Sequence, residues 1–106
     1  MSFIKACSLA DLWIGEMKSV NVGGRAVLLL NWGGRISAYE NRCCHLGVPL
    51  SQGSLKDGKL VCRAHGWEFD PSTGHGINPA TVHLKTYLAK ADDGAIWVDT
   101  EVEHST

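Results

Sequence analysis

Two short segments of the chain each offer one cysteine and one histidine at a spacing that suits metal binding. The first contains Cys43 and His45, the second contains Cys62 and His65, and sixteen residues separate His45 from Cys62. A single residue between Cys43 and His45 lets both side chains point the same way along extended chain, and a tight turn can do the same for the second pair. Two thiolates and two imidazoles can hold either a two-iron, two-sulfide cluster or a tetrahedral zinc ion.

The pairing of unlike ligands within each segment favours the iron–sulfur cluster over zinc. Zinc loops usually pair like ligands, with two cysteines in one loop and two histidines in the other. Two disulfides in a secreted domain are also disfavoured, because Cys43 and Cys44 are adjacent and the N-terminus lacks the hydrophobic region of a secretory signal. The expected ligands of one [2Fe–2S] cluster per chain are therefore Cys43, His45, Cys62 and His65.

Length and composition indicate one small globular domain spanning residues 1–106. Hydrophobic residues make up 44% of the chain and charged residues 20%, which is typical of a folded protein. The formal net charge of −1 argues against nucleic acid as a partner. No stretch approaches the roughly 20 apolar residues that cross a bilayer, so we expect a cytoplasmic protein without membrane contact. Cys7, far upstream of the other cysteines, is expected to be a buried free thiol.

Four glycine-containing dipeptides predict tight β-hairpin turns, because glycine supplies the positive φ that these turns need. They are Gly23-Gly24, Gly33-Gly34, Asp57-Gly58 and Asp93-Gly94. The runs between them predict strands at residues 25–32, 82–89 and 95–99, and residues 8–11 can form at most one helical turn. The predicted fold is all-β, a small antiparallel β-sandwich or barrel.

The metal-binding segments are expected to lie in loops between these strands, at one tip of the domain. Residues 42–54 predict a loop, residues 60–62 and 67–69 predict strands that enter and leave the second segment, and residues 71–74 predict a turn. A tip position allows a redox partner to approach closely. Core packing is expected for Trp13, Trp32 and Trp97, and an apolar collar around the metal site for Trp67, Leu46, Val48 and Pro49.

The two segments resemble the signature of a known family. The motifs Cys43-x-His45-Leu46-Gly47 and Cys62-x-x-His65-Gly66-Trp67-x-Phe69-Asp70 are similar to those of Rieske proteins. The chain as a whole, from Met1 to about Asp99, resembles the Rieske ferredoxins of the toluene monooxygenases, which are bacterial multicomponent enzymes with a diiron hydroxylase. The segments that carry this closer resemblance are Met1-Ser2-Phe3, Cys7-Ser8-Leu9, Trp13-x-Gly15-Glu16-Met17, Cys62-Arg63-Ala64-His65 and residues 73–79.

The resemblance implies an electron carrier that is not itself an enzyme. Such ferredoxins take electrons from an NADH-dependent flavin/iron–sulfur reductase and pass them to the diiron hydroxylase, which oxidises an aromatic or alkene substrate. The implied fold is the Rieske fold with a cluster-binding subdomain at about residues 41–78, monomeric when free. Cys43 and Cys62 would bind the buried iron, and His45 and His65 the outer one.

Two other function classes remain open. The first is a similar ferredoxin that serves a ring-hydroxylating dioxygenase, or a small subunit of the nitrite-reductase type. The second is a zinc-stabilised interaction module without a redox role. The Gly-His-Gly-Ile-Asn-Pro run at residues 74–79 favours the monooxygenase ferredoxin over the first of these.

The chain departs from related motifs at a few positions. Cys44 stands where Pro or Thr is usual, and we expect it to point away from the cluster because neighbouring extended residues face opposite sides. Respiratory-complex Rieske proteins carry a disulfide and Ser and Tyr hydrogen-bond donors near the cluster. The corresponding residues here are Val48, Ala64, Trp67 and Phe69. With fewer donors to sulfur, a low reduction potential is expected. His75 is expected to shape the pocket or to fill space.

Overall fold

The computed structural model describes residues 3–42, 49–63, 66–78 and 80–103. Within these residues the strands form two antiparallel sheets, and helix is limited to two short 3₁₀ turns, η1 (Leu9–Asp11) and η2 (Leu50–Gln52). No helix in this described part of the chain has the length and hydropathy needed to span a bilayer. The predicted all-β, antiparallel fold is confirmed.

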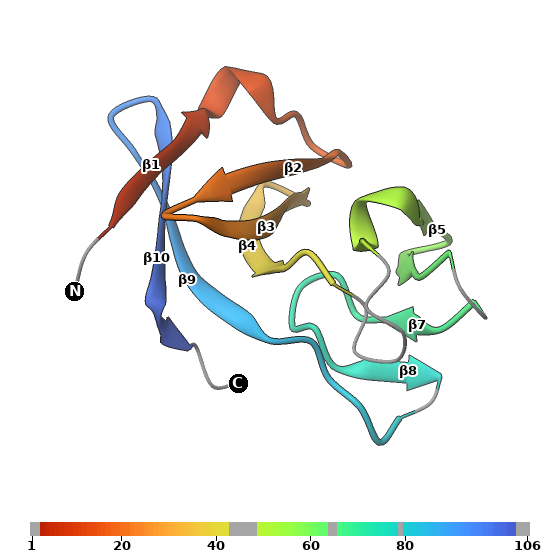
Figure 1. Cartoon of the computed structure of the whole chain (residues 1–106). Helices are drawn as coiled ribbons and strands as arrows, with labels where there is room; N and C mark the ends of the chain where they lie inside the picture. Colours follow the sequence, from red (N-terminus) through yellow and green to blue (C-terminus); the bar gives the residue numbers. More distant parts are fainter. Residues whose placement is uncertain (1–2, 43–48, 64–65, 79, 104–106) are drawn as a thin grey trace.

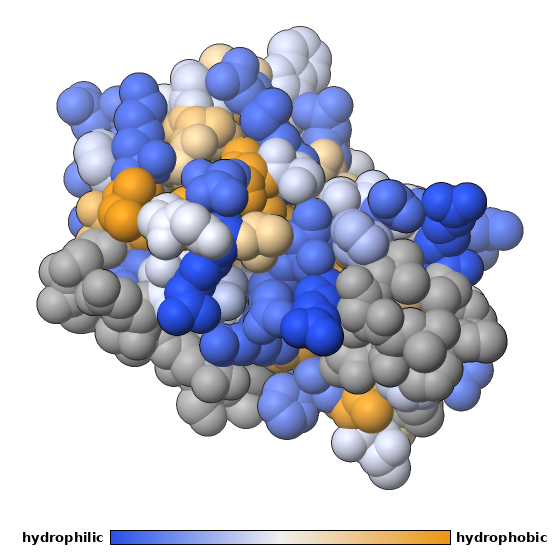
Figure 2. Space-filling view, in the orientation of Figure 1, coloured by the Kyte–Doolittle hydropathy of each residue, from blue (hydrophilic) through white to orange (hydrophobic). Residues whose placement is uncertain are grey.

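The larger sheet has six strands in the order β1–β10–β9–β4–β3–β2. Its strands are β1 (Ile4–Ser8), β2 (Met17–Val22), β3 (Arg25–Trp32), β4 (Arg35–Glu40), β9 (Thr86–Asp92) and β10 (Ala95–Glu103). The two outer strands, β1 and β2, lie next to each other, so the sheet curls into a nearly closed barrel (Figure 1). On the face shown in Figure 2, hydrophilic residues predominate and most hydrophobic ones gather over the barrel.

The smaller sheet has four short strands in the order β5–β6–β7–β8 and lies beside the barrel (Figure 1). Its strands are β5 (Ser54–Lys56), β6 (Lys59–Val61), β7 (Glu68–Phe69) and β8 (Gly76–Asn78). It is formed by the chain between β4 and β9, which are themselves neighbours in the larger sheet. At this junction the backbone N–H of Glu40 donates to the carbonyl of Lys85 at 2.9 Å.

The four predicted hairpin turns are all present, between β2 and β3, β3 and β4, β5 and β6, and β9 and β10. Two of them show why the turn residues matter. Gly23 and Gly24 have φ values of 57° and 84°, and Asp57 and Gly58 have φ values of 52° and 75°. Two consecutive positive φ angles match the right-handed twist of the flanking strands, so these dipeptides direct the chain back along itself.

Strand β3 is buried on both faces, as its continuous apolar run predicts. Leu28 and Leu30 point into a core shared with the smaller sheet, whereas Val27 and Leu29 belong to the core of the barrel. Because side chains alternate across a strand, this one strand lines two hydrophobic cores. The smaller sheet is therefore packed directly on a central strand of the barrel.

Two details of the sequence prediction are corrected. The strand expected at residues 82–89 begins only at Thr86, and the alternation breaks there because Thr86 and Tyr87 are both buried. Leu84 belongs to the core under the smaller sheet and Tyr87 to the barrel core, so the chain crosses from one core to the other at this point. The single helical turn is present as η1, but the side chain of Ser8 makes no capping hydrogen bond.

The prediction for Trp13 is wrong. Its side chain is 72% exposed, and the neighbouring Ile14 is 71% exposed. The loop itself is held in place, because the indole Nε1 donates to the carbonyl of Ala10 and the backbone N–H donates to Glu16 Oε1. These local hydrogen bonds direct the ring outward, whereas a prediction from hydrophobicity alone places it in the core. Trp32 and Trp97 are half-buried.

Candidate metal centre

Cys62 is the one predicted ligand that lies among the described residues; Cys43, His45 and His65 lie outside them, as does Cys44. Cys62 directly follows β6 and is 1% exposed. Its backbone N–H donates to the carbonyl of Trp67 at 2.7 Å, which closes the second segment at its base. Gly66, with a φ of 65°, supplies the left-handed turn that returns the chain toward β7.

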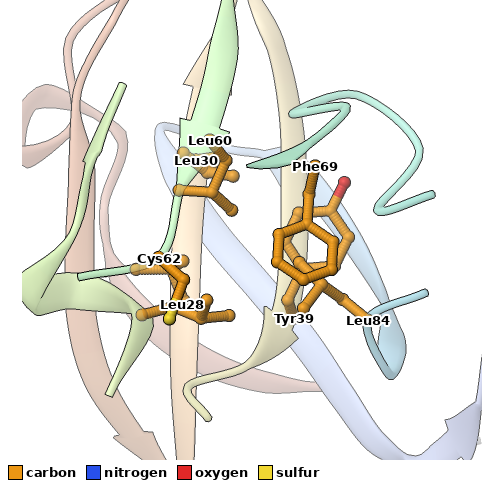
Figure 3. Packing of buried hydrophobic residues seen from close by; sticks show 8 residues of the cluster. Leu28, Leu30, Tyr39, Leu60, Cys62, Phe69 and Leu84 are labelled. Carbon is orange, nitrogen blue, oxygen red and sulfur yellow. The ribbon is translucent and has the colours of Figure 1, made fainter. Parts of the chain in front are cut away.

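The surroundings of Cys62 are apolar. It belongs to a buried cluster whose members come from both sheets: Leu28, Leu30, Tyr39, Leu50, Leu60, Phe69 and Leu84. In Figure 3 its sulfur lies beside Leu28, on the opposite side of the view from the Phe69 and Tyr39 rings. A cysteine in this position suits the inner iron of a cluster, because its thiolate is shielded from water and cluster sulfur is sensitive to solvent.

Asn41 holds the two ends of the first segment together. Its amide Oδ1 accepts a hydrogen bond from the backbone N–H of Ser51 at 2.9 Å, and its Nδ2 donates to Ser51 Oγ at 3.1 Å and to Ser19 Oγ at 3.0 Å. Its backbone N–H donates to the carbonyl of Ala26 in β3. One 8%-exposed side chain thereby joins β2, the chain before Cys43 and the start of η2.

Replacing Asn41 with alanine should destabilise the fold by about 2–3 kcal/mol, because the mutation leaves partly buried donors and acceptors without partners. Urea denaturation of the purified protein measures this change, and the visible absorption of the cluster reports whether it is lost at lower urea. The matched control is Asn21→Ala, since among the described residues Asn21 Oδ1 accepts a hydrogen bond only from the exposed N–H of Gly24 in the β2–β3 turn. An equal effect of both mutations would contradict the role assigned to Asn41.

The second segment is also fixed from the side of β7. The buried hydroxyl of Tyr39 donates to the carbonyl of Pro71 at 2.9 Å, and burial is the main reason that the pKa of Tyr39 is raised to about 12. Gly74, with a φ of 78°, lies against the Tyr39 ring and leaves no room for a side chain. Hydrogen bonds from the side chain and backbone of Ser72 lower the pKa of Asp70, so its carboxylate stabilises this turn in the ionised form.

A polar contact joins the two parts of the chain that carry the predicted ligands. Arg63 Nη1, next to Cys62, donates to Gln52 Oε1 in η2 at 3.2 Å. Gln52 follows the first segment and Arg63 belongs to the second, so the contact holds the bases of the two segments side by side. Arg42 and Pro49, which flank the first segment, are both exposed. Of the predicted apolar collar, Trp67 is half-buried, Pro49 is exposed, and Leu46 and Val48 lie outside the described residues.

Sequence reasoning did not find Asn41, Ser51 or Tyr39 as supports of the site. Each acts through a partner that is ten or more residues away in the chain. The available signal was a polar residue, Asn41, two positions before the first predicted ligand, Cys43. That position is common for turn-forming Asn, whose side chain readily bonds to nearby backbone, so the pattern alone does not identify a long-range anchor.

The donor set fits a two-iron cluster. The described parts place one cysteine in a dry core and close both segments that carry the predicted ligands at their bases by hydrogen bonds, as a cofactor held between two loops requires. Residues 2–88 match the family described as Rieske [2Fe-2S] domain. The chain belongs to the Rieske family. Family membership assigns it one [2Fe–2S] cluster and removes the support for a structural zinc ion.

Relatives within this family include stand-alone ferredoxins. The chain is 41% identical over 102 residues to the ferredoxin component of the alkene monooxygenase system of Xanthobacter autotrophicus, covering 95% of this chain and 84% of that protein. It is 35% identical over 102 residues to the ferredoxin component of biphenyl 2,3-dioxygenase of Rhodococcus jostii, covering 95% of both.

Solved structures agree with this assignment of the fold. A ferredoxin of Sphingomonas yanoikuyae B1 has a TM-score of 0.82 at 27% identity, covering 93% of this chain and 99% of that one. A chain in the complex of reduced oxygenase and oxidised ferredoxin of carbazole 1,9a-dioxygenase has a TM-score of 0.80 at 30% identity, covering 91% of both. The predicted Rieske fold is confirmed.

Proposed function

We propose that the protein is a Rieske ferredoxin, a one-electron carrier that delivers electrons to an oxygenase and has no catalytic activity of its own. The observation that carries this proposal is the similarity of nearly the whole chain to ferredoxin components of oxygenase systems. The solved complex of an oxygenase with a ferredoxin supports the same type of partner.

We further propose that the oxygenase is a diiron hydroxylase of an aromatic or alkene monooxygenase, supplied through an NADH-dependent flavin/iron–sulfur reductase. The higher identity to the alkene monooxygenase ferredoxin, 41% against 35% for the biphenyl dioxygenase ferredoxin, supports this choice. The resemblance of residues 73–79 to toluene monooxygenase ferredoxins supports it as well. A ring-hydroxylating dioxygenase is the second candidate partner, because several relatives serve such systems. A cytoplasmic location follows from this role.

The proposed ligands are Cys43, His45, Cys62 and His65, within a cluster-binding subdomain at about residues 41–78. When bound, the cluster accepts and releases one electron. The protein's own groups keep it in place. The apolar core around Cys62 shields the inner side of the site from water. Asn41 and Tyr39 fix the backbone on either side of the segments that carry the proposed ligands.

Iron and sulfide analysis tests the cofactor and its ligands. The purified protein should be brown and contain two irons and two acid-labile sulfides per chain, and dithionite should produce an EPR signal whose average g lies below that of all-cysteine clusters. A colourless protein with one zinc ion would contradict the proposal.

Electron transfer to purified oxygenases tests the partner. The reduced protein should be reoxidised during turnover by a diiron hydroxylase of the alkene or aromatic monooxygenase type, and much more slowly by a ring-hydroxylating dioxygenase. Stopped-flow absorbance of the cluster measures both rates in the same buffer. Faster transfer to the dioxygenase would favour the second candidate, and transfer to neither would contradict the carrier function.

The reduction potential should lie near the lower end of the Rieske range of about −150 to +300 mV. Hydrogen-bond donors to cluster and ligand sulfur stabilise the added electron, and this chain has Phe69, which cannot donate a hydrogen bond, where respiratory Rieske proteins have a Tyr donor. The Phe69 ring is fully buried, beside Tyr39 and Leu84 in Figure 3, and contributes no polar group. Protein-film voltammetry at neutral pH measures the potential; a midpoint above zero would contradict this explanation.

A further inference from the structure

His75 and His83 are paired across two antiparallel segments of the backbone. They form a β-bridge, with His75 directly before β8 and His83 on the chain that leads into β9. The flanking hydrogen bonds run from Gly76 N–H to the Val82 carbonyl at 2.7 Å and from Leu84 N–H to the Gly74 carbonyl at 2.8 Å. Since the bonds lie on either side of the pair, His75 and His83 occupy a non-hydrogen-bonded position of the ladder, where facing side chains are closest.

The Cβ atoms of the two histidines therefore lie next to each other on one face of the two-stranded ladder. Paired residues of an antiparallel ladder point to the same side, and at such positions their Cβ atoms are about 4.5–5.5 Å apart. Both histidines are exposed. Two rings on Cβ atoms at this separation can converge on one ion at the roughly 2.0–2.1 Å that metal–imidazole bonds require.

We propose that His75 and His83 form a binding site for one divalent transition-metal ion of the imidazole-preferring class, such as Ni²⁺, Zn²⁺ or Cu²⁺. Among the described residues, no cluster of three or more His, Cys, Asp or Glu side chains includes them. The protein supplies two ligands and water completes the coordination. The backbone of Asp70 donates to the carbonyl of His75 at 2.8 Å, so this acidic residue adds favourable negative charge nearby while its carboxylate is bonded to Ser72.

An ion at this site would connect two parts of the fold. His75 adjoins the smaller sheet, and His83 lies on the strand-like segment by which the chain returns to the barrel. An ion that binds the folded protein more tightly than the unfolded chain, in which the β-bridge no longer holds the two histidines together, stabilises the fold by mass action. The ion is thus expected to fasten the cluster-bearing part of the chain to the barrel.

Isothermal titration of the oxidised holoprotein with NiCl₂ tests the site, with His83→Gln and His75→Gln as the first variants. Each variant removes one of two linked ligands, so the affinity for Ni²⁺ should fall at least about tenfold in both. His104→Gln is the control, because it removes a histidine from the C-terminal tail and should leave the affinity unchanged. The visible spectrum of each variant shows whether the cluster and the fold are retained.

Thermal unfolding supplies a second readout. Ni²⁺ should raise the unfolding temperature of the wild-type holoprotein and of His104→Gln, and should not raise that of His83→Gln. This comparison also separates the site from the cluster histidines, which every variant retains. Absence of Ni²⁺ binding by the wild type at millimolar concentration, or unchanged affinity in both variants, would overturn the proposal. Neither outcome would affect the assignment of the [2Fe–2S] cluster.

Discussion

Cys62→Ser and Cys43→Ser should each be isolated without the visible absorption of a [2Fe–2S] cluster. Both mutations remove a thiolate proposed as ligand to the inner iron, and the serine hydroxyl is far less acidic and a poor substitute for a soft ligand. At Cys62 the replacement also places a hydroxyl in the apolar core, where it adds a desolvation cost. Absorbance and iron content of protein purified under identical conditions measure the effect.

The other two cysteines provide matched controls. Cys7 lies in β1, far from the smaller sheet, and burial raises the pKa of its thiol, which makes it a poor ligand. Cys44 is expected to face away from the cluster. Cys7→Ser and Cys44→Ser should therefore keep nearly the full iron content. Retention of the cluster in Cys43→Ser together with its loss in Cys44→Ser would show that Cys44 is the ligand.

Gly53→Ala should destabilise the protein by about 3 kcal/mol, close to the upper range for overpacking a close contact. A Cβ at residue 53 would lie 2.1 Å from the backbone carbonyl oxygen of Val61, and a backbone atom cannot rotate away as a side chain can. Gly53 ends η2, where its N–H donates to the Leu50 carbonyl, and Val61 directly precedes Cys62. The mutation should therefore separate the bases of the two segments that carry the proposed ligands and weaken retention of the cluster. Urea denaturation measures the free energy of unfolding.

Gly34→Ala is the control for this mutation. Gly34 has a φ of 91°, so alanine is strained there, but nothing lies within 4 Å of the added Cβ. We expect a cost of about 1 kcal/mol, from backbone conformation alone. If the two mutations destabilise the protein equally, the clash with the Val61 carbonyl is not the cause of the destabilisation by Gly53→Ala.

Local sequence rules predicted the parts of the fold that depend on neighbouring residues. The hairpins at Gly23-Gly24 and Asp57-Gly58 follow from turn chemistry that four residues determine. The doubly buried strand at residues 25–32 follows from an unbroken apolar run. The motif around Cys62 predicted the family, and with it the cofactor, because two unlike ligands in each segment are seldom found together.

Features that depend on distant residues were not predicted. The start of β9 at Thr86 is set by where the chain pairs with β4. Trp13 is a different case, because the hydrogen bonds that direct it outward lie within its own loop and hydrophobicity alone does not reveal them. The three side-chain hydrogen bonds of Asn41 reach Ser19 and Ser51, whose proximity exists only in the folded protein. The predicted ligands Cys43, His45 and His65 lie outside the described residues, so their roles stay predictions that the cysteine variants and EPR test.

The chain from residue 41 to residue 85 leaves the barrel and returns to it at adjacent strands. Ala38 of β4 pairs with Tyr87 of β9, and Tyr39 pairs with Thr86, so both ends of this excursion are held by the same ladder. All six strands of the larger sheet lie outside the excursion. The barrel can therefore form its complete sheet before the cofactor is inserted, and newly made protein would already have a folded barrel when the iron–sulfur assembly machinery binds it.

Deuterium exchange during cluster loading should accordingly show early protection in β2, β3 and β4, and protection of β5 to β8 only after iron is bound.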